Sequence, residues 1–121
     1  MNGNMKTWRF GVDNNRLVDL VLQGKKTATT SIYEENSISK AGEESILLYE
    51  NGQAACITKT IKVIVTEFKN ITKELAELEG EGDFEEWKTA HIEFFQLIKP
   101  DFNENTKVEF EIFKVIKILK R

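Results

Sequence analysis

The sequence contains one cysteine, one proline and one histidine among its 121 residues. Cys56 therefore has no partner for an internal disulfide, and with a single histidine it does not supply the usual ligand set of a structural zinc site. No segment approaches the roughly 20 apolar residues that a membrane-spanning helix needs, so we expect no membrane partner. Residues 1–6 lack the apolar stretch of a secretory signal, which favours a cytoplasmic protein.

The composition is that of one folded domain. Hydrophobic residues make up 40% and charged residues 31% of the chain, which is typical of a globular protein and not of a disordered one. We expect a single domain over residues 1–121, with residues 1–8 as a loosely ordered N-terminal segment. The formal net charge of −3 argues against extensive nonspecific wrapping by nucleic acid, although it leaves room for a local basic site.

Local patterns predict helices on either side of a group of strands. Capping residues at 13–15, an apolar face and Gly24 predict a helix that ends near Gln23. Further helices are expected at 72–78 and 83–98, a loop at 34–42, and extended segments at 27–33, 45–49, 57–66 and from 108 onward. Asn51-Gly52 between two apolar runs is typical of a hairpin. This order favours an α+β fold, a small, partly closed β-barrel with flanking helices.

Two of the expected strands carry more detailed patterns. In the strand after the hairpin, one parity is apolar, and we expect it to face the core: Ile57, Ile61, Val63 and Val65. In the last strand the alternation that begins at Val108 slips in phase after Ile112, which indicates a bulge or a bend at a barrel corner.

The segment Gly24–Thr30 places a helix stop, two lysines and three threonines in seven residues. Burial or a neighbouring cation such as Lys25 can lower the pKa of Lys26 until it accepts a proton from a threonine hydroxyl. Thr29 can then act as a nucleophile if the backbone bends, because residues three apart in a regular strand point to opposite faces. From the residues alone, a strand entry with exposed lysines is the simpler interpretation.

An acidic run alternates with glycines at Glu79, Glu81 and Asp83. A carboxylate in this run can orient a lysine, act as a general base or hold a divalent cation. The spacing is not that of a calcium-binding loop, and Asp83 is explained as the cap of the following helix, so no metal site is predicted.

Aromatic residues fall into two groups. Those at helical spacing with the histidine are interpreted as packing residues: Trp87, His91, Phe94 and Phe95. Others lie outside helical patterns and, together with Arg9 beside them, are free to line a pocket: Trp8, Phe10 and Tyr33. Arg9 can contact a phosphate or a carbonyl group.

Several of these segments occur together in the order of a known family. They are Phe10-Gly11, the stretch from Leu20 to Ser31, the acidic run and the aromatic helix, and together they resemble the ASCH domain family over nearly the whole chain. The family pattern Gly-x-Lys-x-x-Thr-x-Arg falls on Gly24, Lys26 and Thr29, while Ser31 stands at the arginine position. The resemblance implies a PUA-like fold, related to RNA-binding domains.

The resemblance also implies an activity. Some small bacterial members of this family hydrolyse N4-acetylcytidine. The resemblance to them implies that Lys26 is the base and Thr29 the nucleophile. It also implies that Glu79 is the carboxylate that orients Lys26 or relays protons. Glu81 is the alternative to Glu79. No cofactor is expected, and the expected substrate contacts are Arg9, Phe10, Lys25, Ser31, Tyr33 and Glu81.

Two other functions fit the same residues. One is a non-catalytic RNA-binding or regulatory module in which Lys26 and nearby cations contact phosphate. The other is a metal-assisted ribonuclease built on Glu79, Glu81 and Asp83. The expected partner is a modified nucleoside or RNA. The low basic charge of the chain favours a small substrate over a long RNA, because tight binding to a phosphate backbone needs many cations. The sequence does not indicate an oligomeric state.

Overall fold

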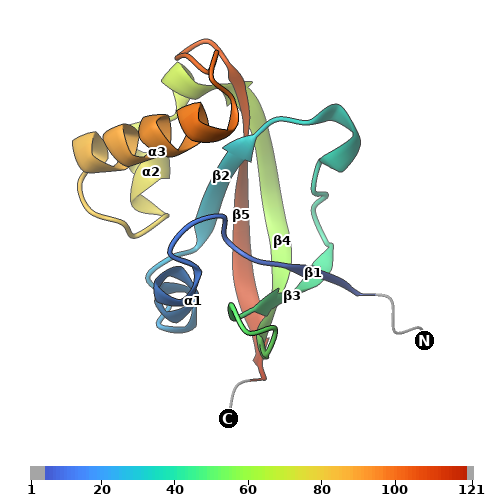
Figure 1. The fold of residues 1–121 in the computed structure, drawn as a ribbon. Coiled ribbons are helices and arrows are strands. Elements are labelled where there is room, and N and C mark those ends of the chain that lie inside the picture. The colour runs from blue at the N-terminus through green and yellow to red at the C-terminus, as the bar shows by residue number, and fades with distance from the viewer. Residues whose placement is uncertain (1–4, 120–121) are drawn as a thin grey trace.

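The computed structural model describes residues 5–119. Within these residues, five strands and three helices form an α+β fold whose sheet curves into a partial barrel without closing (Figure 1). The strands are β1 (Lys6–Trp8), β2 (Ala28–Ile32), β3 (Glu44–Leu48), β4 (Ala54–Glu67) and β5 (Lys107–Ile118). The helices are α1 (Asn14–Leu22), α2 (Lys73–Glu77) and α3 (Phe84–Ile98), with 3-10 turns at Glu35–Ser37 and Phe68–Asn70. The predicted fold class is confirmed.

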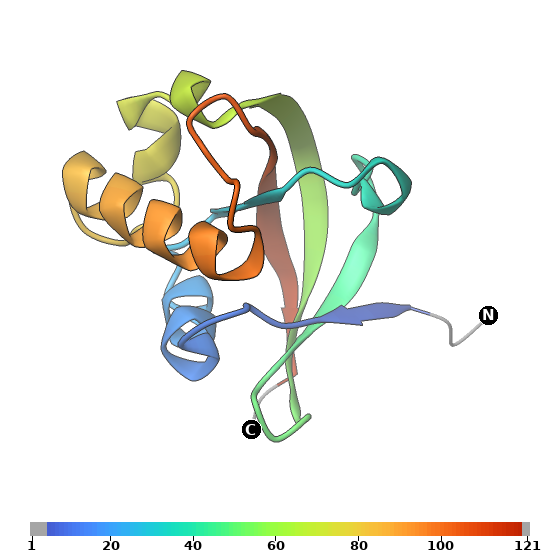
Figure 2. The same ribbon diagram turned by 45° about the horizontal axis from the view of Figure 1, so that its top comes forward.

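The sheet has the strand order β1-β3-β4-β5-β2. β1 pairs with β3 in parallel, and the other neighbours are antiparallel. The three helices gather on one side of the sheet in both views (Figures 1 and 2). This arrangement brings the exit of α1, the turn after α2 and the body of α3 to the same region beside β2.

Two apolar clusters hold the helices against the sheet. The cluster under α3 contains Trp87, Phe95, Phe68, Phe102 and Phe110, and the cluster under α1 contains Val18, Val21, Leu47 and Phe113. Trp87 and Phe95 are each only 2% exposed, which confirms their predicted packing role. None of the helices among residues 5–119 combines the length and the apolarity that crossing a membrane requires.

Local sequence signals explain several boundaries. Asp83 caps α3 in a capping box with Glu86, and Gly52 takes a φ of 89° in the hairpin between β3 and β4. The register between β4 and β5 shifts between Ile57 and Thr58 and again between Thr60 and Lys62. The second shift lies opposite Phe113 and Ile112, where the phase slip predicted an irregularity, and this prediction is confirmed.

The expectation of a loose segment over residues 1–8 is wrong for Lys6–Trp8. These residues form β1, in register with Ser45–Leu47 of β3. A three-residue edge strand is too short to show an alternating pattern, and its partner strand supplies the order that the local sequence does not. Residues 1–4 lie outside the described part of the chain.

The prediction of which side chains of β4 face the core is also wrong. Ile61 and Val65 are 45% and 40% exposed, whereas Thr58 and Thr60 of the other parity are buried. Thr60 turns toward β5, where its hydroxyl donates to Glu111 at 2.6 Å. The inner face of β4 is therefore polar at Thr58 and Thr60, and apolar side chains of β4 face outward at Ile61 and Val65.

Candidate functional site

The turn after α1 brings Lys26 beside the acidic run. Gly24 has a φ of 79°, and the backbone N–H of Lys26 donates to Leu20 O, so the chain curls back over the helix end. Both the backbone N–H and the hydroxyl of Thr27 then donate to the carbonyl oxygen of Leu78, at 2.7 and 3.1 Å. The residue before Thr27 and the residue after Leu78 are consequently held next to each other.

Lys26 and Glu79 form a buried ion pair. Lys26 Nζ donates to Glu79 Oε1 at 2.9 Å and to Glu81 Oε2 at 2.5 Å. The side chains of Lys26 and Glu79 are each 1% exposed, and that of Glu81 is 18% exposed. The second oxygen of Glu79 accepts the hydroxyl of Thr30 at 2.5 Å. Burying two charges is costly unless both are paired and hydrogen-bonded, and here they are.

His91 completes the cluster from α3. Its Nδ1 lies 2.8 Å from Trp87 O and donates to that carbonyl, so Nε2 faces Glu79 Oε1 at 3.5 Å. The imidazole ring stacks on the Trp87 ring with 4.4 Å between centroids. The packing role predicted for His91 is thus present, and the contact with Glu79 is an additional one.

Burial and charge act in opposite directions on these pKa values. Burial alone would raise the pKa of Glu79, but the hydrogen bond from His91 and the charge of Lys26 outweigh it and hold the pKa well below its usual range. Burial alone would lower the pKa of His91, but its hydrogen bond with the Glu79 carboxylate and the charge of that group raise it above its usual value. The cluster therefore favours an ionised Glu79 and a protonated His91.

These pKa shifts predict that the protein loses stability as the pH rises and His91 loses its proton. Because the folded-state pKa of His91 is raised, its stabilisation is complete below the unfolded-state pKa of about 6.5 and is lost as the pH rises through the folded-state value. The contribution of Glu79, whose pKa is lowered, is lost only as the pH falls into the acidic range. We expect the urea midpoint of the wild type to fall between about pH 6 and pH 8. The His91→Gln variant should lack this fall, and an equal fall in both proteins would contradict the assignment.

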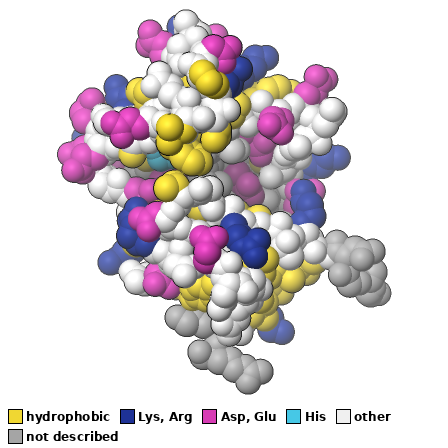
Figure 3. Space-filling model, in the orientation of Figure 1, with side chains coloured by type: hydrophobic (Ala, Val, Ile, Leu, Met, Phe, Trp, Pro, Cys, Tyr) yellow, Lys and Arg dark blue, Asp and Glu magenta, His cyan; other side chains and the backbone are white. Residues whose placement is uncertain are grey.

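Two adjoining cavities open beside this cluster. The smaller, of about 100 Å³, is lined by Lys26, Glu79, Glu81 and His91 among others, and the larger has a volume of about 420 Å³. They share the residues Phe10, Gly11, Thr29, Thr30, Phe94 and Phe95, so they form one cleft. The surface between α3 and the segment that follows β1 is hollowed, with apolar and acidic side chains along it (Figure 3). The cluster thus lies at the inner end of a cleft with aromatic walls.

The cleft contains most of the residues predicted for catalysis and binding. Thr29 lines both cavities and Lys26 lines the smaller one, while Thr30, the next residue, is the one bonded to Glu79. Four of the expected substrate contacts line the cleft: Arg9, Phe10, Ser31 and Glu81. The Arg9 side chain donates to Tyr49 O, and the Phe10 ring lies under Lys26 Nζ at 5.2 Å.

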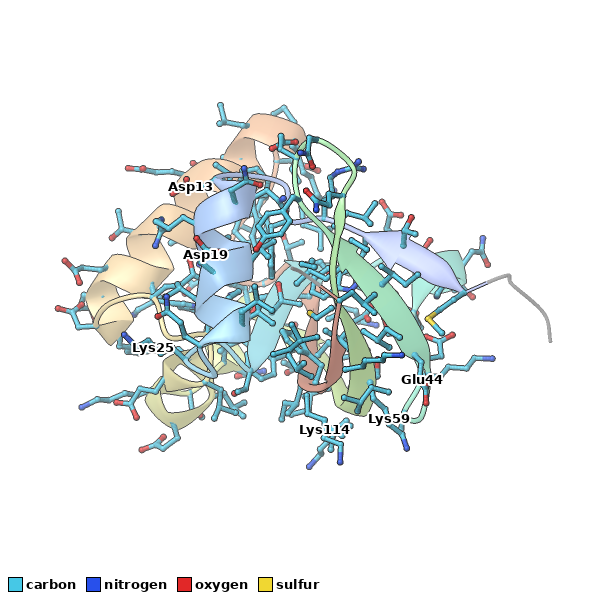
Figure 4. The ribbon with its side chains drawn as sticks, turned by 90° about the horizontal axis from the view of Figure 1, so that it is seen from below. Asp13, Asp19, Lys25, Glu44, Lys59 and Lys114 are labelled. Carbon is cyan, nitrogen blue, oxygen red and sulfur yellow. The ribbon has the colours of Figure 1, made fainter. Side chains whose placement is uncertain are left out.

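Two expected contacts lie elsewhere. Lys25 is exposed at the exit of α1 (Figure 4), and it lines neither cavity. Tyr33 also lines neither cavity, and Lys107 Nζ lies over its ring at 5.7 Å. Lys25 lies at the exit of α1 and Tyr33 directly follows the end of β2, and neither side chain reaches the cleft.

The cleft also contains residues that were not predicted as site residues, among them Thr30, His91, Glu109 and Glu111. The alternation of acids and apolar residues along β5 was a signal for the two glutamates, since residues two apart share a face of a strand. No local signal links Thr30 or His91 to Glu79, because these contacts join segments far apart in the sequence.

The acidic residues of the cleft do not form the metal site considered for a ribonuclease. Asp83 is the cap of α3 and does not join Glu79 and Glu81. Donor atoms of Glu79, Glu81 and His91 do lie within 4.8 Å of one another. However, the Lys26 amine donates to both carboxylates, so an ammonium group already serves as their cation.

A family model described as ASCH domain matches residues 6–117. The chain belongs to the ASCH domain family. This family is associated with RNA binding. Among curated proteins, the search finds no significant match to the chain.

Solved structures of bacterial proteins support the same assignment. The ASCH domain from Lactobacillus crispatus JV V101 is 25% identical with a TM-score of 0.85, over 93% of this chain and 80% of that chain. A protein from Enterococcus faecalis V583 is 27% identical with a TM-score of 0.86, over 100% of this chain and 86% of that chain.

Proposed function

We propose that this ASCH domain is an amidohydrolase that removes the acetyl group from N4-acetylcytidine or a similar acylated nucleoside, free or within RNA. The observation that carries this proposal is the position of Lys26. Its amine is buried between Glu79 and Glu81 at the inner end of a cleft, and Thr29 lines the same small cavity. A hydroxyl near a lysine that carboxylates orient matches the general pattern of nucleophile, base and orienting group in acyl transfer.

The two cavities suggest how the substrate is placed. The larger cavity accommodates the nucleobase, with Phe10 and Phe94 on its walls. The smaller cavity then receives the acyl group beside Lys26 and Thr29. Placing the acyl carbon next to the hydroxyl gives the nucleophile the proximity that acyl transfer needs.

The proposed reaction begins with the release of a proton from Lys26 to Glu81, whose partly exposed side chain passes it to solvent. Neutral Lys26 takes the hydroxyl proton of Thr29 as Oγ attacks the acyl carbon. The C–N bond of the resulting tetrahedral intermediate breaks, and Lys26 returns the proton to the departing nitrogen. Water then attacks the acetyl ester of Thr29, which releases acetate and restores the hydroxyl group.

Glu79 and its other partners act as positioning residues in this scheme. Glu79 accepts from Lys26 and Thr30, and His91 faces the same carboxylate. These contacts hold the Lys26 amine in one position beside Thr29. A fixed base near the nucleophile is more effective than a mobile one, because its orientation is set before the reaction.

The test is hydrolysis of N4-acetylcytidine, followed as the appearance of cytidine, with wild type and Thr29→Val. We expect the variant to lose activity by about 10²-fold or more, because valine keeps the shape of threonine but has no nucleophile. Thr66→Val on β4 is the matched control, since Thr66 lines neither cavity of the cleft. Full activity of Thr29→Val would refute its role as the nucleophile.

The same assay decides between the proposal and its alternatives. If the wild type leaves N4-acetylcytidine unchanged but binds RNA in a salt-dependent way, the non-catalytic module is the correct function. The cross-strand pair Lys59 and Lys114, which is on the opposite face of β4 from Thr58 and Thr60, would then be the first phosphate contact to examine (Figure 4). Cleavage of RNA that stops on addition of a chelator would identify a metal-assisted ribonuclease instead.

A further inference from the structure

The larger cavity has a polar wall formed by β2 and β5. Thr29 is in register with Glu111, and Ser31 with Glu109. Residues directly opposite each other in an antiparallel pair point to the same face, with Cβ atoms about 4.5–5.5 Å apart. The proposed nucleophile therefore has a carboxyl group as its immediate cross-strand neighbour.

Glu109 lies on the same wall as Glu111 and has one hydrogen bond among the described residues. It is 5% exposed and lines the cavity, and its Oε2 accepts the backbone N–H of Ser39 at 3.0 Å. Among residues 5–119, no lysine or arginine forms an ion pair with it, and its other oxygen receives no hydrogen bond. A backbone N–H can only donate, so Glu109 is the acceptor in this contact.

Glu111 lies two residues along the same face and has different partners. Its oxygens contact the hydroxyl groups of Ser39 at 3.2 Å and Thr60 at 2.6 Å. Hydroxyl groups can rotate to accept as well as to donate, so they tolerate a protonated carboxyl. Burial raises the pKa of Glu111 above its usual value, and the nearby charge of Glu109 adds to the rise, against the two hydroxyl contacts that lower it. Of the two acids, Glu111 is the one suited to hold a proton.

We infer that Glu111 is an acid that donates its proton to a ring nitrogen of the substrate next to the acylated exocyclic nitrogen. This inference rests on the proposed function, and it narrows the substrate class to acyl amides of amino-heteroaromatic bases such as cytosine. In N4-acetylcytidine the ring nitrogen N3 is adjacent to the carbon that carries the amide. In the proposed orientation the acyl carbon lies at Thr29 and the edge that carries N3 faces Glu111, which is the cross-strand neighbour of Thr29.

Proton donation to N3 would assist the difficult step of the reaction. As Glu111 gives its proton to N3, the electrons of the breaking C–N bond move onto N4, and the base leaves as its neutral imino tautomer. N4 then takes the proton held by Lys26, and N3 returns its proton to Glu111, which gives cytidine and the original acid. No negative charge forms on the leaving nitrogen, so the leaving group is better than an amide anion.

Ligands that carry no acyl group test the contact between Glu111 and N3 independently of the reaction. We expect the wild type to bind cytidine about tenfold more tightly than 3-deazacytidine, in which a C–H group replaces N3, because one hydrogen bond is lost. Glu111→Ala should bind both nucleosides equally. Glu44→Ala, which removes an exposed carboxylate of β3 outside the cleft, should keep the tenfold preference.

Measuring hydrolysis distinguishes proton donation by Glu111 from a simple hydrogen bond. The side-chain amide of Glu111→Gln still donates a hydrogen bond but has no acidic proton, so this variant should keep the preference for cytidine. Its hydrolysis of N4-acetylcytidine should fall by about 10²-fold. Thermal unfolding of each variant verifies that it is folded before binding is compared.

The outcomes for the contact and for the proposed function are distinct. A wild type without preference for cytidine, or a Glu111→Ala variant that keeps the preference, would overturn the inference even if N4-acetylcytidine is hydrolysed. A preference that disappears in Glu111→Ala would support the contact between Glu111 and N3 even if the wild type does not hydrolyse N4-acetylcytidine, and the proposed activity would then fail. Unchanged hydrolysis by Glu111→Gln would show that the contact with N3 is a hydrogen bond without proton transfer and overturn the catalytic role.

Discussion

Replacing Lys26 by methionine should lower the free energy of unfolding by about 3–5 kcal/mol, because it leaves buried Glu79 without its main counter-charge. Methionine fills nearly the same volume, so the loss arises from charge and not from a cavity. Urea denaturation near pH 7 measures the effect. The double variant Lys26→Met/Glu79→Gln should recover a large part of the loss, since it removes the unpaired charge as well.

The pH dependence of Lys26→Met provides a second measure. In the wild type, the low pKa of Glu79 makes its stabilising contribution decline as the pH falls. Without Lys26, burial favours the protonated form of Glu79, and the difference in stability between variant and wild type should narrow on acidification. Lys25→Met, at the exposed neighbouring position, is the matched control and should change stability by less than about 0.5 kcal/mol. A similar cost at Lys25 and Lys26 would show that charge burial is not the cause.

The predictable part of the fold is the part with local physical causes. The cap at Asp83, the glycine after α1 and the Asn51-Gly52 turn fix boundaries through their own backbone preferences. In contrast, β1 is ordered by its partner strand, and the exposed face of β4 is set by the curvature of the whole sheet. An alternating strand pattern shows that two faces differ, but it does not show whether the inner face borders an apolar core or a polar cleft.

The site was predictable to the extent that a resemblance supplied it. Lys26 and Glu79 were chosen as partners by the family pattern, and the buried ion pair of 2.9 Å agrees with that choice. Glu79 and Glu81 were left as alternatives, and both contact Lys26, with Glu79 the buried one. Thr30 was not predicted to bond with Glu79, since adjacent threonines on β2 are chemically equal in the sequence and only the fold distinguishes their faces.

Gly80 is the backbone position on which the geometry of this site depends most. It has a φ of 68°, and a Cβ atom there would lie 2.2 Å from the carbonyl oxygen of Lys25. Both the left-handed backbone and the close approach to another backbone atom exclude a side chain without a shift. A shift of either segment would separate Lys26 from Glu79, because these two residues directly follow and precede the contact.

Gly80→Ala should therefore cost about 2–4 kcal/mol in unfolding free energy, from left-handed strain together with steric overlap. It should also reduce hydrolysis of N4-acetylcytidine in the protein that remains folded, because the Lys26 amine is displaced. Gly24→Ala is the matched control: its φ is 79°, but a Cβ atom there meets nothing within 4 Å. It should cost only about 1–2 kcal/mol, from backbone strain alone, and leave hydrolysis unchanged. Equal losses of stability and activity in the two variants would mean that backbone conformation, and not the contact with Lys25, is what Gly80 provides.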